Sequence, residues 1–99
     1  MILIAGTFTI QEEDREAAIA AMTEMMAETA KEDGCVSYDM TSSFDDPTKI
    51  HLFEEWESEE HLQAHFVAPH MAVFQKAVAS IGPVERNIFK YSAGEKSPL

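Results

Sequence analysis

The centre of the chain, residues 35–57, reads CVSYDMTSSFDDPTKIHLFEEWE and combines two strand patterns with a turn. Residues 35–44 alternate as a strand does, with Val36, Tyr38 and Met40 on one face. Residues 49–57 alternate in the same way, and their two faces are Ile50/Leu52/Glu54/Trp56 and His51/Phe53/Glu55/Glu57. Between them, Asp45-Asp46-Pro47 favours a turn, because Asp side chains bond nearby backbone N–H groups and Pro fixes φ. The stretch therefore predicts a β-hairpin.

The segment before the hairpin predicts a strand followed by a helix. In residues 1–10 the apolar side chains on one strand face are Ile2, Ile4, Phe8 and Ile10. Residues 15–32 are rich in helix formers, and their apolar stripe consists of Ala18, Met22, Met25 and Thr29. Asp14 is expected to cap the start of this helix, and Gly34 is expected to end it.

The segment after the hairpin predicts two helical stretches and a last strand. Ser58 followed by two acidic residues is typical of a helix start, and this helix is expected to end near Phe66. Pro69 opens a second helical stretch, which is expected to end before Gly82-Pro83. Residues 84–91 then alternate as a strand.

This order of elements, β-α-β-β-α-β, predicts an α+β fold of the ferredoxin-like class, with a four-stranded antiparallel sheet and helices on one face. One domain is expected over residues 1–93, with a flexible C-terminal tail over residues 94–99. The sheet face away from the helices also carries apolar side chains, which a monomer would leave exposed. The sequence therefore predicts a homodimer in which a second sheet covers this face.

Composition narrows the possible partners and the compartment. The 99 residues include 18 acidic and 7 basic ones, which gives a formal net charge of −11. Such a surface repels phosphate backbones and anionic lipid, so neither nucleic acid nor a membrane is an expected partner. The N-terminus lacks the pattern of a signal peptide, and Cys35 alone cannot form an intrachain disulfide. A cytoplasmic location is therefore expected.

Three histidines, His61, His65 and His70, form the densest group of residues that could carry chemistry. His65 and His70 are the expected catalytic residues, because imidazole accepts a proton near neutral pH. Glu54 is the third expected catalytic residue. A partly buried carboxylate needs a partner, and His65, Tyr38 or Arg86 could pair with it. Paired with a histidine, it could orient the imidazole. His61 and His65 could instead share a metal ion, being four residues apart on a helix, but the spacing offers no third ligand. No metal site is therefore predicted.

Large apolar and aromatic side chains are available to hold a flat ring. The expected substrate-binding residues are Tyr38, Phe53, Trp56, Phe66, Met71 and Phe74. Methionines at positions 22, 25 and 26 could provide an adaptable wall over a cavity, although such clusters are more often plain core.

The middle of the chain also resembles a known family. The resemblance rests on the pattern G-C-x-x-Y, E-x-W-x-S-x-E-x-L-x-x-H and P-H-x-x-x-F, which spans residues 34–74. In these motifs the chain is similar to the antibiotic biosynthesis monooxygenase (ABM) family, and within it to the small bacterial quinol monooxygenases. The predicted first and last strands fit this family as well.

This resemblance implies a dimeric α/β barrel with a pocket in each subunit between the sheet and its helices. It implies a monooxygenase that acts with dioxygen on a quinol or on a polycyclic phenolic or anthrone-type aromatic, without metal, flavin or haem as cofactor. An alternative is that the same pocket serves a small-molecule isomerase or a non-catalytic ligand-binding protein, because isomerase relatives share the P-H-x-x-x motif at Pro69 and His70.

Overall fold

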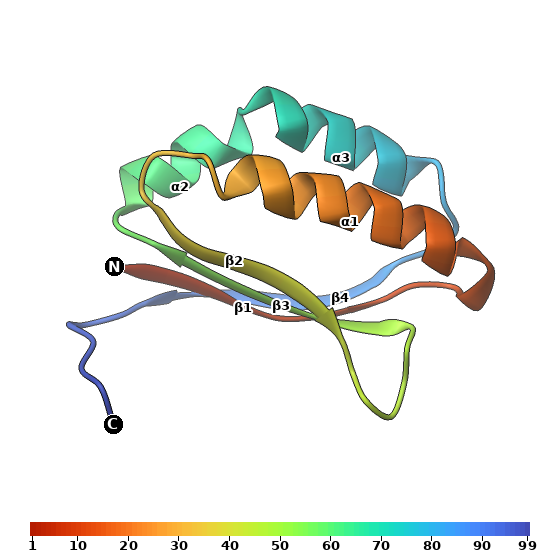
Figure 1. Cartoon of the computed structure of the whole chain (residues 1–99), viewed down its shortest axis with the longest axis horizontal. Coiled ribbons are helices and arrows are strands. Elements are labelled where there is room, and N and C mark those ends of the chain that lie inside the picture. Colours follow the sequence, from red (N-terminus) through yellow and green to blue (C-terminus); the bar gives the residue numbers. More distant parts are fainter.

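Four strands form one antiparallel sheet in the order β2-β3-β1-β4, and the helices lie on one of its faces (Figure 1). The computed structural model describes all residues from 1 to 99. Along the chain the elements are β1 (Ile2–Thr9), the 3-10 helix η1 (Glu12–Asp14), α1 (Arg15–Thr29), β2 (Cys35–Ser42), β3 (Lys49–Trp56), α2 (Glu59–Phe66), α3 (Pro69–Ala79) and β4 (Glu85–Ser92). The predicted ferredoxin-like β-α-β-β-α-β arrangement is confirmed.

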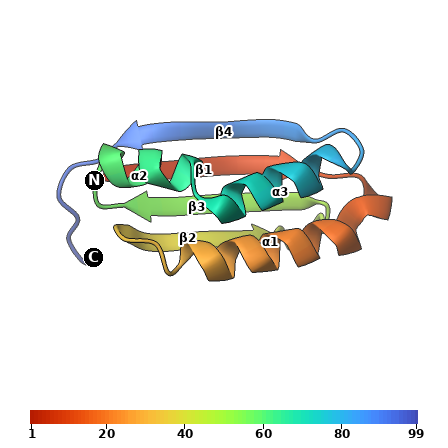
Figure 2. The same cartoon turned by 90° about the horizontal axis from the view of Figure 1, so that it is seen from above.

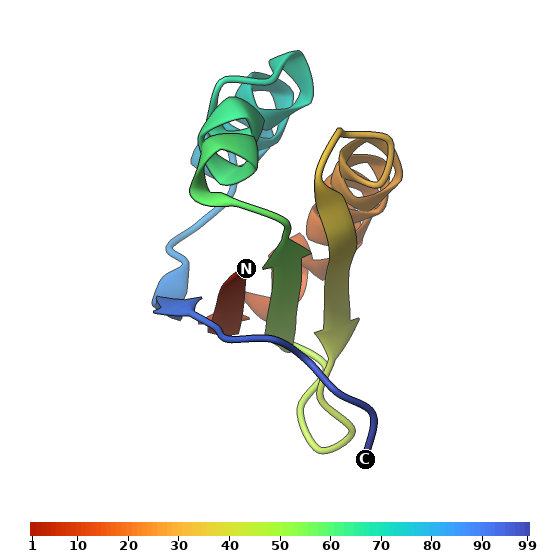
Figure 3. The same cartoon turned by 90° about the vertical axis from the view of Figure 1, so that its left-hand side faces the viewer.

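The helices cover the sheet unevenly. Seen from above, α1 runs along the β2 edge, α2 and α3 lie over the middle strands, and no helix lies over β4 (Figure 2). The end-on view agrees, with α1 and the α2–α3 pair forming two separate ridges above the sheet (Figure 3). The helix-side face of β4 is therefore the least covered part of the sheet. None of the helices has the length and apolar character that crossing a membrane requires.

The core lies between the sheet and the helices, with α1 contributing most of its helical residues. Its strand residues alternate as predicted, and those buried on β1 and β3 include Ile2, Ile4, Ile50, Leu52 and Trp56. The buried residues of α1 are Ala18, Met22, Met25 and Thr29, which confirms the predicted apolar stripe. The apolar stripe of α1 and the apolar faces of the strands thus pack together in one layer.

Helix α1 ends three residues earlier than predicted, at Thr29 rather than at Glu32. The backbone N–H groups of Lys31 and Glu32 bond to carbonyls three residues back, so the chain tightens into a turn. Gly34 then adopts φ +79°, and an added Cβ there would lie 2.1 Å from the His61 ring. Glu32 therefore sits in a turn between α1 and β2, where its side chain reaches across to the other helices.

Two further local predictions were wrong. Asp14 occupies the N-cap position of α1 without capping it; its Oδ2 accepts a hydrogen bond from Gly82 N–H at 2.9 Å and ties the α3–β4 loop to the start of α1. Val36 does not share a buried face with Tyr38, because a bulge between Cys35 and Ser37 shifts the register and leaves Val36 exposed.

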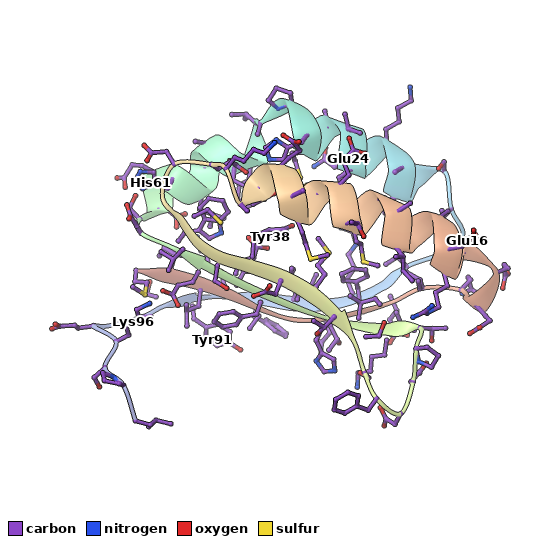
Figure 4. The ribbon with its side chains drawn as sticks, in the orientation of Figure 1. Glu16, Glu24, Tyr38, His61, Tyr91 and Lys96 are labelled. Carbon is purple, nitrogen blue, oxygen red and sulfur yellow. The ribbon has the colours of Figure 1, made fainter.

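The sheet face opposite the helices carries a row of exposed apolar side chains. Ala5 of β1 lies between Phe53 of β3 and Phe89 of β4, and these two rings are 41% and 55% exposed. Leu3 lies beside Tyr91, which is also exposed. Figure 4 shows Tyr91 on the opposite side of the sheet from Tyr38, which points toward the helices.

Candidate active site

A cavity of about 560 Å³ lies between the sheet and helices α1 and α3 and extends to the inner face of β4. Most of its wall is apolar, with Met22 and Met25 from α1 and Met71 and Phe74 from α3. The polar and charged side chains that line it are Tyr38, Glu54, His65, Gln75, Ser80, Arg86 and Lys90. An apolar chamber with a few polar groups suits a largely apolar small molecule, and its volume falls in the usual range for such sites.

One carboxylate behind this wall holds two histidines. Oε2 of Glu32 lies 2.5 Å from Nδ1 of His65 and 2.8 Å from Nε2 of His70. Because an ionised carboxylate can only accept hydrogen bonds, both ring nitrogens carry a proton in these contacts. The arrangement fixes the orientation of both imidazoles and makes Glu32 the link between the α1–β2 turn and helices α2 and α3.

The second ring nitrogen of His65, Nε2, is free to act on a ligand. With the proton on Nδ1, the neutral ring has its lone pair on Nε2, and this atom makes no hydrogen bond in the structure. Nε2 of His65 is not among the fully buried polar atoms without a partner, so it keeps a small accessible surface, although the side chain as a whole is only 1% exposed. Because His65 lines the cavity, we infer that this small surface faces it.

Burial sets the protonation of His65. Its side chain is 1% exposed, and the loss of hydration lowers its pKa below the ordinary value, while the bond to Glu32 and its charge act in the opposite direction. The ring stacks at a tilt on Trp56, with centroids 4.8 Å apart, and lies 5.4 Å from the Tyr38 ring. These contacts favour a neutral, rigidly held imidazole.

Glu54 faces the same cavity but does not pair with a histidine. Its Oε1 accepts a hydrogen bond of 2.9 Å from Nε1–H of Trp56. Burial raises the pKa of Glu54 to about 7, and the charge of Glu32 adds to the rise, whereas the Trp56 bond lowers it. Glu54 can therefore be either protonated or ionised near neutral pH, which suits a group that gives or takes a proton.

Tyr38 presents a neutral phenol to the cavity. Burial raises its pKa above the ordinary value, and the charges of Glu54 and Glu32 raise it further. No residue of the chain is a hydrogen-bond partner of its hydroxyl. Tyr38 is thus a permanent O–H donor for a ligand oxygen.

The structure brings only part of the predicted site together. Of the nine residues expected, Tyr38, Glu54, His65, Phe66, Met71 and Phe74 line the cavity. His70 does not line it and bonds to Glu32 instead. His61 lies near the start of α2, where it bonds to Ser58 and faces Asp33.

Two of the expected substrate-binding residues lie elsewhere. Phe53 is on the opposite face of the sheet, because strand alternation directs it away from its neighbour Glu54. Trp56 is fully buried behind His65 and is not part of the cavity wall. Its indole instead supports the imidazole and the Glu54 carboxylate.

Sequence reasoning missed Glu32 and the basic side chains of β4. Glu32 is far from its partners in sequence and stands among other acidic residues, so no local pattern marks it. Arg86 and Lys90 lie on the helix side of β4, and alternation around Ile88 could have placed them there. Lys90 is paired with Glu59, whereas Arg86 forms no ion pair.

Comparison with known proteins agrees with this architecture. The family model described as antibiotic biosynthesis monooxygenase matches residues 1–77. The "Probable quinol monooxygenase YgiN" of Escherichia coli K12 is 35% identical over 72 residues, which are 65% of this chain and 69% of that protein. The uncharacterised protein YjcS of Bacillus subtilis is 31% identical over 67 residues, or 68% and 64% of the two chains.

Solved structures show the same fold. A Deinococcus radiodurans protein, crystallised as a candidate antibiotic biosynthesis monooxygenase, superposes with a TM-score of 0.90 at 22% identity, covering 100% of this chain and 98% of its own. Rv0793 of Mycobacterium tuberculosis gives a TM-score of 0.84 at 26% identity, with 98% of each chain covered. The fold and the family match together lead to one conclusion: this chain belongs to the antibiotic biosynthesis monooxygenase family.

Proposed function

We propose that this protein is a monooxygenase that uses dioxygen to oxidise a quinol or a polycyclic phenolic or anthrone-type aromatic, with His65 as the base. The observation that carries the proposal is the free Nε2 of His65 at the wall of an apolar cavity, with Nδ1 held by Glu32. A hydrogen bond from Nδ1–H to a carboxylate orients an imidazole and raises its basicity. Glu32 is thus a positioning residue, and His65 is the catalytic residue.

The proposed reaction begins when Nε2 of His65 takes a proton from the substrate. The resulting anion is electron-rich and passes one electron to dioxygen, and recombination of the two radicals forms a C–O bond. Loss of water from this peroxide leaves one oxygen atom in the quinone product and the other in water. Such a reaction requires a base, a largely apolar cavity and a fixed substrate orientation, and the mostly apolar lining around His65 supports this proposal.

The remaining polar groups of the cavity fit this substrate class. Tyr38 can donate a hydrogen bond to a ring oxygen, and the unpaired guanidinium of Arg86 can attract an anionic one. Glu54, with a pKa of about 7, can return a proton when the peroxide loses water. The name of the E. coli relative supports a quinol as the first substrate to examine.

We further propose that the protein works as a homodimer. The ABM family is typically dimeric, and the row formed by Phe53, Ala5 and Phe89 leaves an apolar sheet face uncovered in the single chain. Burying such a face against a second copy removes apolar area from water and needs no further partner.

Oxygen uptake tests the enzymatic proposal. Metal-stripped protein is mixed with a reduced naphthoquinone or an anthrone, and dioxygen is followed with an electrode. We expect uptake above the uncatalysed rate, reduced by about 100-fold or more in His65→Gln, since general-base catalysis contributes about that much or more. Glu32→Gln should lower the rate less, and His61→Gln, outside the cavity, should leave it unchanged.

The same experiment can contradict the proposal in two ways. Uptake that survives in His65→Gln would remove His65 as the base. Turnover of an added substrate without oxygen consumption would favour an isomerase, for which His65 and Glu54 on one cavity could remove and return a proton.

A further inference from the structure

We propose that Glu32, His65 and His70 form a binding site for a divalent transition-metal ion of the zinc class, and that the bound ion switches off His65 as a base. The site itself does not depend on the proposed function. The switching part rests on the proposed role of His65, and the experiment below separates the two.

The three side chains already converge on one point. Oε2 of Glu32, Nδ1 of His65 and Nε2 of His70 all lie within 4.8 Å of one another. Ligand atoms around one zinc ion stand roughly 3.0–3.5 Å apart, because each lies about 2.0–2.2 Å from the metal. To admit an ion, the two hydrogen bonds of 2.5 and 2.8 Å have to lengthen, and the two ring nitrogens, which lie within 4.8 Å of each other, have to stand at the same ligand spacing.

The three ligands come from well-anchored but separate elements. Glu32 lies in the turn after α1, His65 in the last turn of α2, and His70 in the first turn of α3. An ion here would hold the turn and both helices together. Metal binding to a folded chain stabilises it in this way.

Charge and exposure favour a cation at this point. The Glu32 side chain is 14% exposed, and its only partners are the two imidazoles, so no Lys or Arg neutralises it. His70 is 16% exposed, which leaves room for water or another small ligand to complete the coordination. In a chain with a net charge of −11, the surrounding potential also attracts a cation.

The donor set selects the type of metal. Two imidazole nitrogens and one carboxylate oxygen suit zinc, cobalt, nickel, copper or ferrous iron. Calcium and magnesium prefer all-oxygen sites with more ligands, so they fit poorly here. Three protein ligands leave at least one open position on a tetrahedral ion.

Occupancy would change the tautomer of His65. A metal ion takes the lone pair of Nδ1, so the proton that Nδ1 carries in the hydrogen bond to Glu32 is lost from that atom. The neutral ring bound through Nδ1 carries its proton on Nε2 and can no longer accept one there. The ion lies behind the cavity wall, at the other nitrogen of the ring, and does not need to touch the substrate.

Zinc titration of metal-stripped protein, followed by calorimetry, tests the site without any substrate. We expect one zinc ion per chain, with affinity about 100-fold weaker or more in Glu32→Gln and His70→Gln. His51→Gln and His61→Gln are matched controls and should bind zinc as the parent does. Thermal denaturation without metal shows whether each variant folds, and cobalt absorption bands report the number of ligands in the parent protein.

The outcomes separate the two parts of the proposal. Absence of zinc binding, or binding lost with His61→Gln but kept in His70→Gln, would overturn the site. If bound zinc prevents His65 from acting as a base, ¹⁵N NMR should find Nε2 of His65 protonated in the zinc-bound form, and zinc should stop oxygen uptake. An unprotonated Nε2 in the zinc-bound form, or oxygen uptake that continues or requires zinc, would overturn the switch. A protein that binds zinc at the three ligands but never consumes oxygen would contradict the proposed function and leave the site standing.

Discussion

Replacing Glu54 with Gln should change how stability depends on pH. Glu54 is 6% exposed on β3, between Ile4 and Tyr38 of the neighbouring strands. Burial raises its pKa from an ordinary 4.5 to about 7, against the opposing effect of the Trp56 hydrogen bond. The folded protein therefore holds a proton on Glu54 over a pH range in which the unfolded chain has lost it.

The sign and size of the effect follow from this difference. Between pH 4.5 and about 7 the folded state binds more protons than the unfolded state at this group, so stability falls as the pH rises. Each pH unit in this window lowers the free energy of unfolding by about 1.4 kcal/mol, and complete ionisation of Glu54 lowers it by about 3 kcal/mol. Gln cannot ionise, and its side-chain oxygen can still accept the Trp56 hydrogen bond.

Urea denaturation at about pH 5 and about pH 8, at one protein concentration, measures the effect. The parent should lose about 2.5 kcal/mol more than Glu54→Gln over this interval, because at about pH 5 the group is already mostly ionised in the unfolded chain. His65 titrates in the opposite sense, because its lowered pKa makes stability fall as the pH drops through its unfolded pKa. This contribution is common to both proteins and cancels in the comparison. An equal pH dependence in the two proteins would refute the argument that burial keeps Glu54 protonated.

Two other substitutions test the sheet. In Gly6→Ala the new Cβ would lie 2.1 Å from the Asn87 carbonyl oxygen, and φ at Gly6 is +157°. We therefore expect the free energy of unfolding, measured by urea denaturation, to fall by about 3 kcal/mol. The control Gly94→Ala, which has open space around it, should leave this free energy unchanged. Phe89→Glu should convert the proposed dimer to monomers, as measured by light scattering. The control Val73→Glu, on the exposed surface of α3, should leave the dimer intact. A monomeric parent protein, or a dimer that tolerates Phe89→Glu, would contradict the proposed interface.

The fold could be predicted because its signals are local. A few neighbouring residues are enough to produce each of these signals: the alternation within each strand, the apolar stripe of α1 and the Ser58 cap. Ser58 Oγ does accept the His61 backbone N–H, as the sequence indicates. The hairpin turn at Asp46 also behaves as predicted, with its carboxylate accepting from the Thr48 N–H. Tertiary packing then agrees with the local preferences.

The site was harder to predict because its central contact is not local. Glu32 meets His65 and His70 across separations of 33 and 38 residues, and nothing in its own neighbourhood distinguishes it from a solvated acid. The misplacement of Phe53 has a different origin. Alternation already assigns Phe53 and Glu54 to opposite faces of one strand, so the two could not both line one cavity.

The break between α2 and α3 allows His65 and His70 to reach the same carboxylate oxygen of Glu32. In an uninterrupted helix, His65 and His70 would project about 140° apart around the axis, because five residues at about 100° each exceed one turn by that angle. They could not then share one carboxylate oxygen. Pro69 disfavours a helical conformation at Ala68, which is extended with ψ 147°, and the chain restarts as α3 with His70 in its first turn. The proline thus allows two histidines from one region of sequence to approach Glu32 from two helices, with His65 bonded at Nδ1 and His70 at Nε2.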